Sequence, residues 1–267
     1  MSQQFSGPKK SLGQNFLQDQ NIIRKIIASL GDCANTLVLE IGPGRGALTD
    51  HLMSITQDLH IVEFDHDLAE YWQAKSQERS NLTVHSIDIL KLDLAKIVDT
   101  VDAKIKVIGN LPYNISSPVL FHLMPFAEHF DSQIVMLQKE VVDRMTSSSG
   151  SKQYGRLSVM LQYRYQIEQL FTVPSNAFFP PPKVNSAIAR LTPRPSSELS
   201  VLCFDDFSQL VKQAFSQRRK TLRNTLKQLL PANLIEECGI DASDRAESLN
   251  VNEFVLLANA FTESKNN

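Results

Sequence analysis

The stretch Thr36–Leu52, TLVLEIGPGRGALTDHL, decides the fold that the sequence predicts. Its apolar run Leu37–Ile41 is typical of a strand buried on both faces, and we expect a helix to begin immediately after the glycines. Gly42, Gly44 and Gly46 can adopt a positive φ and let the backbone approach a ligand, while the first helical turn offers unpaired N–H groups. The pattern predicts a nucleotide-binding turn, although an ordinary tight strand-to-helix connection would look the same.

The spacing of these glycines and the charge beside them indicate the kind of nucleotide. A dinucleotide-binding turn has two residues between its second and third glycines, whereas only Arg45 separates Gly44 from Gly46. Glu40 would repel a pyrophosphate unless Arg45 offset its charge. NAD is therefore disfavoured, and a cofactor with a positive centre and no phosphate is favoured. S-adenosylmethionine, a sulfonium attached to an adenosine, is such a cofactor.

Composition narrows the class of protein further. The chain has 267 residues, 42% of them hydrophobic, and no apolar run long enough to span a membrane, which predicts a soluble protein. The first ten residues lack the apolar core of a signal peptide. Cys33, Cys203 and Cys238 form no C-x-x-C pair, and the histidines have no metal-ligand spacing. We therefore expect a cytoplasmic protein with no disulfide framework and no metal site.

The charged residues are segregated along the chain. A net charge of −2 argues against a nucleic-acid partner. Every charged residue from Phe207 to Leu230 is nevertheless basic, and the N-terminal Lys9, Lys10, Arg24 and Lys25 are opposed only by Asp19. Such segregation can hide a basic face on an acidic protein. The candidate phosphate-binding residues are Arg218, Arg219, Lys220, Arg223 and Lys227. On a helix, Arg219 would lie on the same side as Arg223, and Lys220 on the same side as Lys227. The alternative is that these residues form a solvated helix surface with no partner.

The order of predicted elements indicates an α/β fold followed by a helical part. A helix over residues 19–31, capped by Asp19, precedes the central strand, and further strands are predicted over residues 60–65, 82–86, 106–109, 133–138, 165–173 and 184–193. Alternation with helices predicts parallel pairing, and the last strand is expected to run antiparallel. Strand patterns stop near the linker at 193–199, and one long helical pattern covers residues 204–230. We predict a Rossmann-like domain over residues 1–195 and a smaller all-helical C-terminal domain over residues 196–267.

Four candidate site residues occupy the carboxyl ends of predicted parallel strands. Gly42 follows the first of these strands, and Glu63 ends the next, where an acid can bind two ribose hydroxyls. Asp88 could accept a hydrogen bond from an adenine amino group, although a plain turn aspartate is an equal alternative. Asn110 follows the fourth strand. Because such ends meet at one edge of a sheet, we expect these residues to lie together.

Asn110 begins the sequence Asn-Leu-Pro-Tyr-Asn, which suits methyl transfer to an adenine amino group. That nitrogen is a poor nucleophile because its lone pair is delocalised into the ring. Acceptors on both amino hydrogens, the Asn110 side-chain oxygen and the Leu111 carbonyl, would favour the tetrahedral nitrogen of the transition state. Pro112 would fix the backbone, and Tyr113 would stack on an unpaired base. A simple turn is the alternative.

The segment PSNAFFPPPKV, residues 174–184, holds two adjacent aromatic side chains. Its three consecutive prolines predict a stiff, extended loop that cannot join a ladder and that presents Phe178 and Phe179. The alternative is that both rings fill the core.

Motifs spread over nearly the whole chain resemble one known family. KKSLGQNFL, EIGPGRGALT, Glu63, Asp88, NLPYN and FFPPPKVNS, in this order, closely resemble the KsgA family of ribosomal RNA adenine dimethyltransferases. The resemblance implies that S-adenosylmethionine is contacted by Asn15, Leu17, Gly42, Glu63, Asp88 and Asn110. It also implies that Phe178, in the pattern Phe-x-Pro-x-Pro-x-Val, borders the target base and joins Asn110, Leu111, Pro112 and Tyr113 in the catalytic set.

The resemblance implies a substrate as well. In that family two adjacent adenosines, in a hairpin loop near the 3′ end of 16S rRNA in the small ribosomal subunit, are each methylated twice at N6 during subunit biogenesis. The erythromycin-resistance methyltransferases, which modify large-subunit RNA, are similar through the first domain, but NLPYN with Asn114 and FSQRRKTLRNTL resemble the KsgA family. A ribosome assembly factor that keeps the cofactor fold without catalysis is an alternative of another class.

Overall fold

The computed structural model describes residues 7–9 and 12–266, and the chain divides into two compact units. One unit takes in Met1–Val142 and Glu168–Pro193, and the other takes in Asp143–Ile167 and Arg194–Asn267. The boundary predicted between residues 195 and 196 lies close to the last division, between Pro193 and Arg194, but the sequence did not indicate that residues 143–167 group with the C-terminal helices. Among the described residues, no helix has the length and apolar character that crossing a membrane requires.

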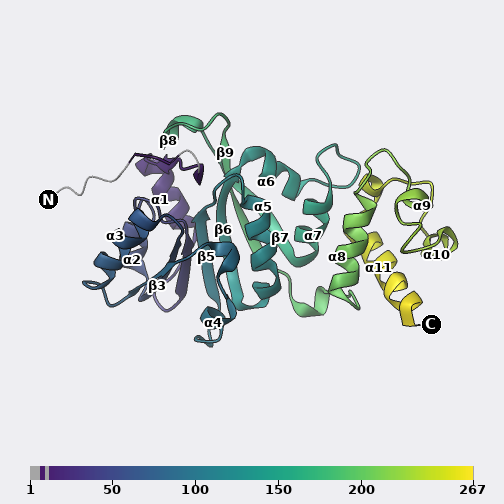
Figure 1. Cartoon of the computed structure of the whole chain (residues 1–267), viewed down its shortest axis with the longest axis horizontal. Helices are drawn as coiled ribbons and strands as arrows, with labels where there is room; N and C mark the ends of the chain where they lie inside the picture. The colour runs from purple at the N-terminus through teal and green to yellow at the C-terminus, as the bar shows by residue number, and fades with distance from the viewer. Residues whose placement is uncertain (1–6, 10–11, 267) are drawn as a thin grey trace. The chain divides into compact units, whose positions relative to one another are not determined.

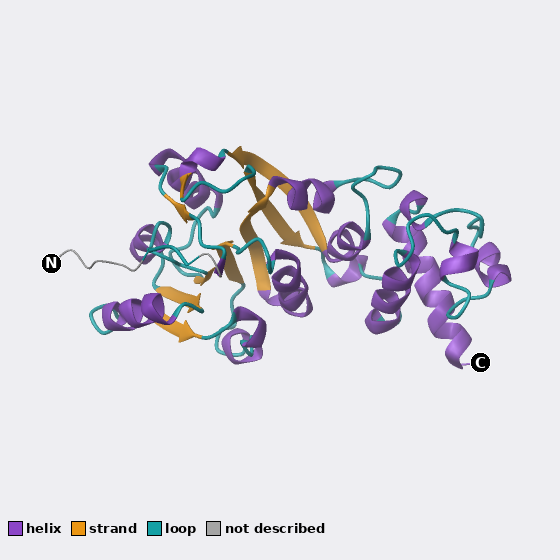
Figure 2. Ribbon diagram, turned by 45° about the horizontal axis from the view of Figure 1, so that its top comes forward, coloured by secondary structure: helices purple, strands orange, loops and turns teal. Residues whose placement is uncertain are grey.

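A seven-stranded sheet forms the first unit, with the strand order β4-β3-β2-β5-β6-β9-β7. The strands β2 to β6 pair in parallel, and β9 pairs with β6 in the antiparallel sense, as predicted. Helices lie on both faces of this sheet (Figures 1 and 2). The strands are β2 Leu37–Ile41, β3 Asp58–Glu63, β4 Leu82–Ser86, β5 Ile105–Asn110, β6 Phe130–Gln138, β7 Tyr165–Val173 and β9 Ser186–Pro193.

The helical segments before and between these strands follow the predicted alternation. They are α1 Gln20–Ser29, α2 Thr49–Ile55, α3 His66–Ser76, η2 Ile89–Lys91, α4 Ala95–Val98, α5 Ser116–Leu123, η3 Met124–His129, α6 Lys139–Thr146 and η4 Ser175–Ala177. The prediction for α1 is confirmed, since the Asp19 carboxylate accepts hydrogen bonds from the amides of Asn21 and Ile22 at 2.8 and 3.2 Å. Ile23 and Ile26 of this helix are buried in the core of the unit.

The direction of the chain reverses at the centre of this sheet. From β2 it proceeds to β3 and β4 on one side, then returns to β5 and β6 on the other. In open parallel sheets a crevice forms at such a switch point, beyond the carboxyl ends of the strands. Here the crevice falls between the ends of β2 and β5, which carry Gly42 and Asn110.

A second, two-stranded sheet corrects the prediction for the proline-rich segment. The strand β1, Phe16–Leu17, pairs antiparallel with β8, Phe178–Phe179, so both phenylalanines do join a ladder. The prolines begin only at Pro180, so they end the pairing without preventing it. The Phe178 side chain is 4% exposed and lies in the core, whereas Phe179 is 51% exposed. The alternative that both phenylalanine rings fill the core is therefore correct for Phe178 and not for Phe179.

The second unit is helical apart from the first residues of β7. Its remaining elements are α7 Arg156–Arg164, η5 Ser196–Glu198, α8 Phe204–Ala214, α9 Leu222–Thr225, α10 Ala232–Glu237, η6 Ala246–Ser248 and α11 Val251–Asn266. The buried side chains Phe207, Leu210, Val211 and Leu222 face inward, as expected.

The prediction of one long helix over residues 204–230 is wrong in one respect. Helix α8 ends at Ala214, and turns occupy the residues before α9. The amides of Leu222 and Arg223 donate to the carbonyls of Asp244 and Ala242, at 2.7 and 2.9 Å, instead of to a preceding helical turn. A pairing with a distant segment therefore interrupts the helix that the local apolar spacing predicts.

Candidate active site

A cavity of about 240 Å³ occupies the switch point of the sheet. All six residues expected to contact the cofactor line it: Asn15, Leu17, Gly42, Glu63, Asp88 and Asn110. Leu111, Pro112 and Tyr113 line it as well. Phe178 is not among the residues that line the cavity; it is buried in the core together with Leu17, its partner in the ladder.

The glycine turn is shaped by close packing. Gly42, Gly44 and Gly46 have φ values of 70°, 55° and 91°, which confirms the expected conformation. A Cβ atom on Gly46 would lie 2.8 Å from the ring of Trp72, and the Trp72 Nε1 atom donates to the Gly44 carbonyl at 2.9 Å. Trp72 of α3 therefore fixes this turn from behind. Its role could not be inferred from a single tryptophan in a helical pattern. Helix α2 begins only at Thr49, later than expected.

Glu63 is held in a fixed orientation at the end of β3. Its Oε2 accepts a hydrogen bond from the Gly44 amide at 3.1 Å, and its Oε1 accepts one from the Asp65 amide at 2.8 Å. Burial raises the pKa of Glu63, and these amides oppose the rise by stabilising the ionised form. The carboxylate is thus held in one orientation at the edge of the cavity.

Glu40 places a second carboxyl group beside the cavity. The side chain is 1% exposed, and its Oε2 atom has no hydrogen-bond partner among the described residues. Burial raises the pKa of Glu40 to about 8, and the negative charges of Glu63 and Asp50 add to the rise. A neighbouring anion such as a pyrophosphate would disfavour the ionised carboxylate further, whereas a cation would stabilise it.

Asp88 serves the local turn and also lines the cavity. Its Oδ1 accepts a hydrogen bond from the Leu90 amide at 3.0 Å and caps η2. The other oxygen, Oδ2, makes no hydrogen bond within the described part of the chain. The two alternatives for Asp88 are therefore compatible, since one oxygen stabilises the turn and the other is available to a ligand.

Asn110 is oriented by the N-terminal segment. Its Nδ2 donates to the Asn15 carbonyl at 3.1 Å, and this leaves Oδ1 as an acceptor. The Leu111 amide is bonded to the Met136 carbonyl at 3.2 Å, and no described residue donates to the Leu111 carbonyl. Two acceptors of the kind that the sequence predicts are thus present at the end of β5.

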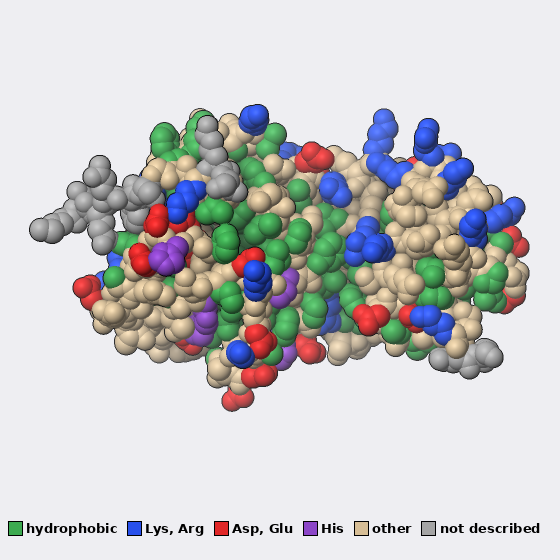
Figure 3. Space-filling model, in the orientation of Figure 1, with side chains coloured by type: hydrophobic (Ala, Val, Ile, Leu, Met, Phe, Trp, Pro, Cys, Tyr) green, Lys and Arg blue, Asp and Glu red, His purple; other side chains and the backbone are tan. Residues whose placement is uncertain are grey.

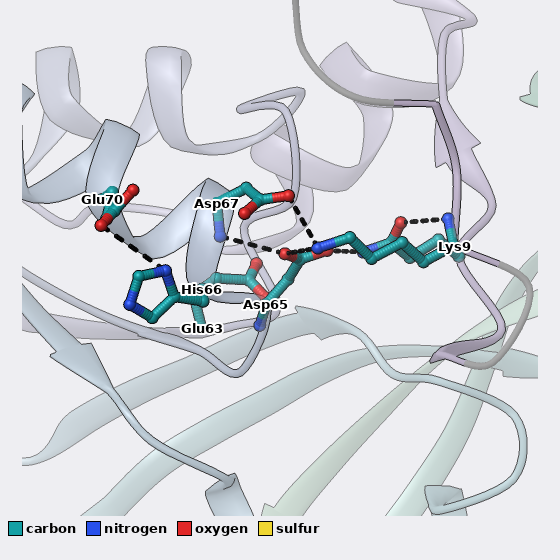
Figure 4. Close-up of polar contacts among 7 residues, drawn as sticks. Lys9, Glu63, Asp65, His66, Asp67 and Glu70 are labelled. Atoms are coloured by element: carbon teal, nitrogen blue, oxygen red, sulfur yellow. Dashed lines mark hydrogen bonds and ion pairs between the residues drawn. The ribbon is translucent and has the colours of Figure 1, made fainter.

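An ionic cluster ties the N-terminal segment to α3 (Figure 4). The Lys9 Nζ atom lies 2.5 Å from Asp65 Oδ1 and 2.8 Å from Asp67 Oδ2, and Gln14 donates to Asp65 Oδ2 at 2.7 Å. The expectation that only Asp19 opposes the N-terminal basic residues is wrong, because Lys9 is paired and Asp19 caps α1. Lys10 lies outside the described residues. Neither Gln14 nor Asp65 was singled out from the sequence, because their contact joins distant segments.

Tyr113 also has a partner that the sequence did not reveal. Its hydroxyl oxygen lies 2.6 Å from Ser186 Oγ, at the first residue of β9. Burial raises the pKa of Tyr113, so the phenol is neutral near pH 7. The loop after β5 is thereby connected to the end of the proline-rich segment.

The basic residues of the second unit are exposed but differ in their partners. Lys and Arg side chains gather over the part of the surface that α8 to α11 form (Figure 3). Arg218 donates to the Lys152 carbonyl at 2.7 Å and to Glu247 Oε2 at 3.2 Å. Arg223 lies 4.0 Å from Glu236 Oε1. Arg219, Lys220 and Lys227 are exposed and form no ion pair with the described residues.

The prediction that these basic residues share the sides of one helix is wrong. Arg218, Arg219 and Lys220 lie in the turns between α8 and α9, Arg223 lies in α9, and Lys227 follows it.

No group of three histidine, cysteine, aspartate or glutamate side chains that could hold a metal occurs in the described ranges.

The strand order and the cavity at the switch point define a Rossmann-like fold with a ligand site, and the similarity to known proteins makes the chain an S-adenosylmethionine-dependent methyltransferase. The model of the family described as ribosomal RNA adenine dimethylase matches residues 6–263, and the chain belongs to this family. It is an enzyme that dimethylates adenine in ribosomal RNA.

Individual relatives agree with this assignment. The chain is 46% identical over 259 residues to the Ribosomal RNA small subunit methyltransferase A of Hydrogenovibrio crunogenus. The aligned region covers 96% of this chain and 97% of that relative. The protein of the same name from Francisella tularensis subsp. novicida is 46% identical over 253 residues, or 94% and 96% of the two chains.

Two solved structures share the fold. A dimethyladenosine transferase from Plasmodium falciparum is similar with a TM-score of 0.79 and 26% identity, over 94% of this chain and 98% of that one. The 23S rRNA methyltransferase ErmE is similar with a TM-score of 0.70 and 23% identity, over 93% and 100%, which shows a common fold.

Proposed function

We propose that this chain dimethylates N6 of two adjacent adenosines in a hairpin loop near the 3′ end of 16S rRNA, within the small ribosomal subunit. Membership of the adenine dimethylase family and relatives named for the small subunit support the choice of substrate. The reaction belongs to subunit biogenesis in the cytoplasm.

The residues around the cavity suit S-adenosylmethionine. The oriented Glu63 carboxylate fits two ribose hydroxyls, and Asp88 Oδ2 fits the adenine amino group. Asn15, Leu17, Gly42 and Asn110 complete the proposed contacts. Glu40, buried and with its Oε2 atom unpaired among the described residues, fits a cofactor that carries positive charge. When bound, this cofactor supplies an electrophilic methyl group on a sulfonium.

The orientation of Asn110 is the observation that carries the proposal. The Asn15 carbonyl accepts a hydrogen bond from Asn110 Nδ2, so Asn110 Oδ1 is available as an acceptor. The Leu111 carbonyl is available as well, because no described residue donates to it. An adenine amino group that donates to both acceptors has its lone pair localised on nitrogen, and the tetrahedral transition state is favoured. No strong general base is needed, since positioning next to an activated methyl group supplies much of the rate.

The neighbouring residues hold the base in place. Pro112 fixes the loop, and Tyr113 stacks on a base that has left its helix. Phe178, which the resemblance places beside the base, is buried in the core with its ladder partner Leu17, so its proposed role is to support the base site through Leu17. Arg219, Lys220 and Lys227 are the main proposed phosphate-binding residues of the second unit, because Arg218 and Arg223 already lie beside Glu247 and Glu236.

Methyl transfer to isolated subunits tests this function. Small and large subunits from a methylation-deficient strain are incubated with labelled S-adenosylmethionine, and the modified nucleosides are identified by mass spectrometry. We expect N6,N6-dimethyladenosine at adjacent positions of 16S rRNA. Label in large-subunit RNA alone would indicate an activity like that of the resistance enzymes, and subunit binding with no transfer would indicate an assembly factor.

Calorimetry tests the cofactor site separately. Glu63→Ala removes hydrogen bonds to a charged acceptor, so binding of S-adenosylmethionine should weaken by about 1.5–3 kcal/mol. Glu70→Ala, an exposed glutamate of α3, is the matched control and should leave the affinity unchanged. Tight NADH binding without S-adenosylmethionine binding would overturn the cofactor assignment.

A further inference from the structure

The hydrogen bond between Tyr113 and Ser186 joins the loop after β5, which lines the cavity, to the first residue of β9. Ser186 is 0% exposed, and its Oγ atom lies 2.6 Å from the Tyr113 hydroxyl. Tyr113 lines the cavity, whereas Ser186 does not, so the serine acts on a substrate only through the tyrosine.

The main chain around Ser186 is fixed independently of its side chain. Ser186 is opposite Gln138 in the ladder between β6 and β9. The carbonyl of Asn185 accepts from the Lys139 amide at 3.0 Å, and its side chain accepts from the Ser175 amide at 3.2 Å. Removal of the Ser186 hydroxyl should therefore leave the strand in place and release only the tyrosine ring.

Tyr113 is anchored at both ends of its side chain. The Pro112 carbonyl accepts from the Ile115 amide and from Ser116 Oγ, each at 3.1 Å, which holds the loop backbone. At the other end, Ser186 holds the phenol oxygen. A ring restrained in this way presents one face to a stacked base, whereas a ring held by its backbone alone has freedom about χ1 and χ2.

The need for this restraint differs between the two methylations. In each transfer N6 forms a bond to the methyl carbon, the carbon–sulfur bond breaks with its electrons going to sulfur, and one N6 proton leaves to water. An unmethylated amino group has two hydrogens for Asn110 Oδ1 and the Leu111 carbonyl. After the first transfer one hydrogen remains, so only one of these hydrogen bonds can form, and stacking on Tyr113 must supply more of the positioning.

We propose that Ser186 is a positioning residue that holds the Tyr113 ring for the second methylation of each adenosine. This inference rests on the proposed function, because it requires dimethyladenosine as the product. It assigns to the serine that ends the proline-rich motif a role in product specificity, distinct from cofactor binding.

Single-turnover rates of the first and second transfers test the proposal on small subunits at saturating S-adenosylmethionine. Ser186→Ala should slow the second transfer about threefold to tenfold, the effect of one net hydrogen bond, and slow the first transfer less. N6-monomethyladenosine should accumulate. Ser186→Thr keeps the hydroxyl and should restore the product ratio, while cofactor affinity stays unchanged.

A double-mutant cycle separates positioning from a general structural effect. Tyr113→Phe should reproduce the product ratio of Ser186→Ala, and the double variant should be no worse than either single variant. Ser158→Ala is the control, since Ser158 is buried and bonded to the Arg144 carbonyl in the second unit. Equal slowing of both transfers, or additive effects of the two substitutions, would overturn the proposal.

The wild-type result distinguishes the two levels of the argument. If wild-type protein forms no dimethyladenosine on small subunits, the proposed function fails and this inference fails with it. If wild-type protein forms it and Ser186→Ala yields the same ratio of products, only the role of Ser186 is refuted.

Discussion

The Glu63 carboxylate accepts a hydrogen bond from the Gly44 amide at 3.1 Å. The other two glycine amides are also bonded within the protein, Gly42 to the Val62 carbonyl and Gly46 to the Pro43 carbonyl, each at 2.9 Å. In phosphate-binding turns such amides point at the anion. Here the protein's own groups occupy them, so the turn orients the Glu63 carboxylate and does not form a pyrophosphate cradle.

Asn110→Ala should lower turnover on small subunits by roughly a hundredfold or more, because it removes a transition-state acceptor. Single-turnover rates at saturating cofactor measure the effect, and some loss of cofactor affinity should accompany it. Asn21→Ala, on the exposed side of α1, is the matched control. A rate near that of wild type would eliminate the proposed role of Asn110.

Glu40 should make cofactor binding dependent on pH. Its folded-state pKa of about 8 lies above the ordinary value of 4.5, so the cavity without a cation favours the protonated carboxyl. The free energy of unfolding should therefore fall as the pH rises from 4.5 through about 8. A bound cation favours the ionised form, so affinity for S-adenosylmethionine should rise about tenfold between roughly pH 6.5 and 8.5.

Glu40→Gln provides the comparison for this pH dependence. The amino group of the cofactor also titrates, and its contribution is common to both proteins. Calorimetry across the pH range should give a steeper rise for the wild type than for Glu40→Gln. Parallel curves would show that Glu40 does not respond to the charge of the cofactor.

The positions at the strand ends could be predicted because they depend on local patterns. Buried strands, the polar residue after each one and the alternation with helices placed Gly42, Glu63, Asp88 and Asn110 at one edge of the sheet, as the structure shows. The alternation alone did not predict β1, whose partner β8 lies far along the chain.

Contacts between distant segments could not be predicted. The bonds from Trp72 to Gly44 and from Tyr113 to Ser186 join segments 28 and 73 residues apart, and no local pattern specifies either pair. The failure of the long helix over residues 204–230 has the same cause, since the amide of Leu222 bonds to the Asp244 carbonyl.

Gly46→Ala should destabilise the first unit by about 2–4 kcal/mol, because it combines strain at a φ of 91° with a Cβ atom 2.8 Å from Trp72. Gly31→Ala is the control, with a φ of 68° but only an ordinary contact at 3.9 Å. It should cost about 1 kcal/mol. Thermal unfolding measures both, and equal losses would show that the contact with Trp72 adds nothing.

The basic residues of the second unit should differ in what they contribute to RNA binding. Arg218 bridges Lys152 and Glu247, so Arg218→Gln should lower stability slightly, by about 0–1 kcal/mol for an exposed pair. Its effect on the salt dependence of subunit binding should be small, because the guanidinium is already engaged.

Arg219, Lys220 and Lys227 are exposed and form no ion pair within the described part of the chain, so their charges are available to phosphates. Replacing all three with glutamine should weaken subunit binding and reduce the slope of log K against log salt by up to about two units, since each phosphate contact releases counterions. Cofactor affinity should not change, because phosphate contacts position an RNA while the pocket selects the base. If the triple variant binds subunits with unaltered affinity and slope, the RNA-binding face lies elsewhere. Arg24 and Lys25, exposed on α1, are then the residues to replace. Lys9 is not a candidate, because it is paired with Asp65 and Asp67.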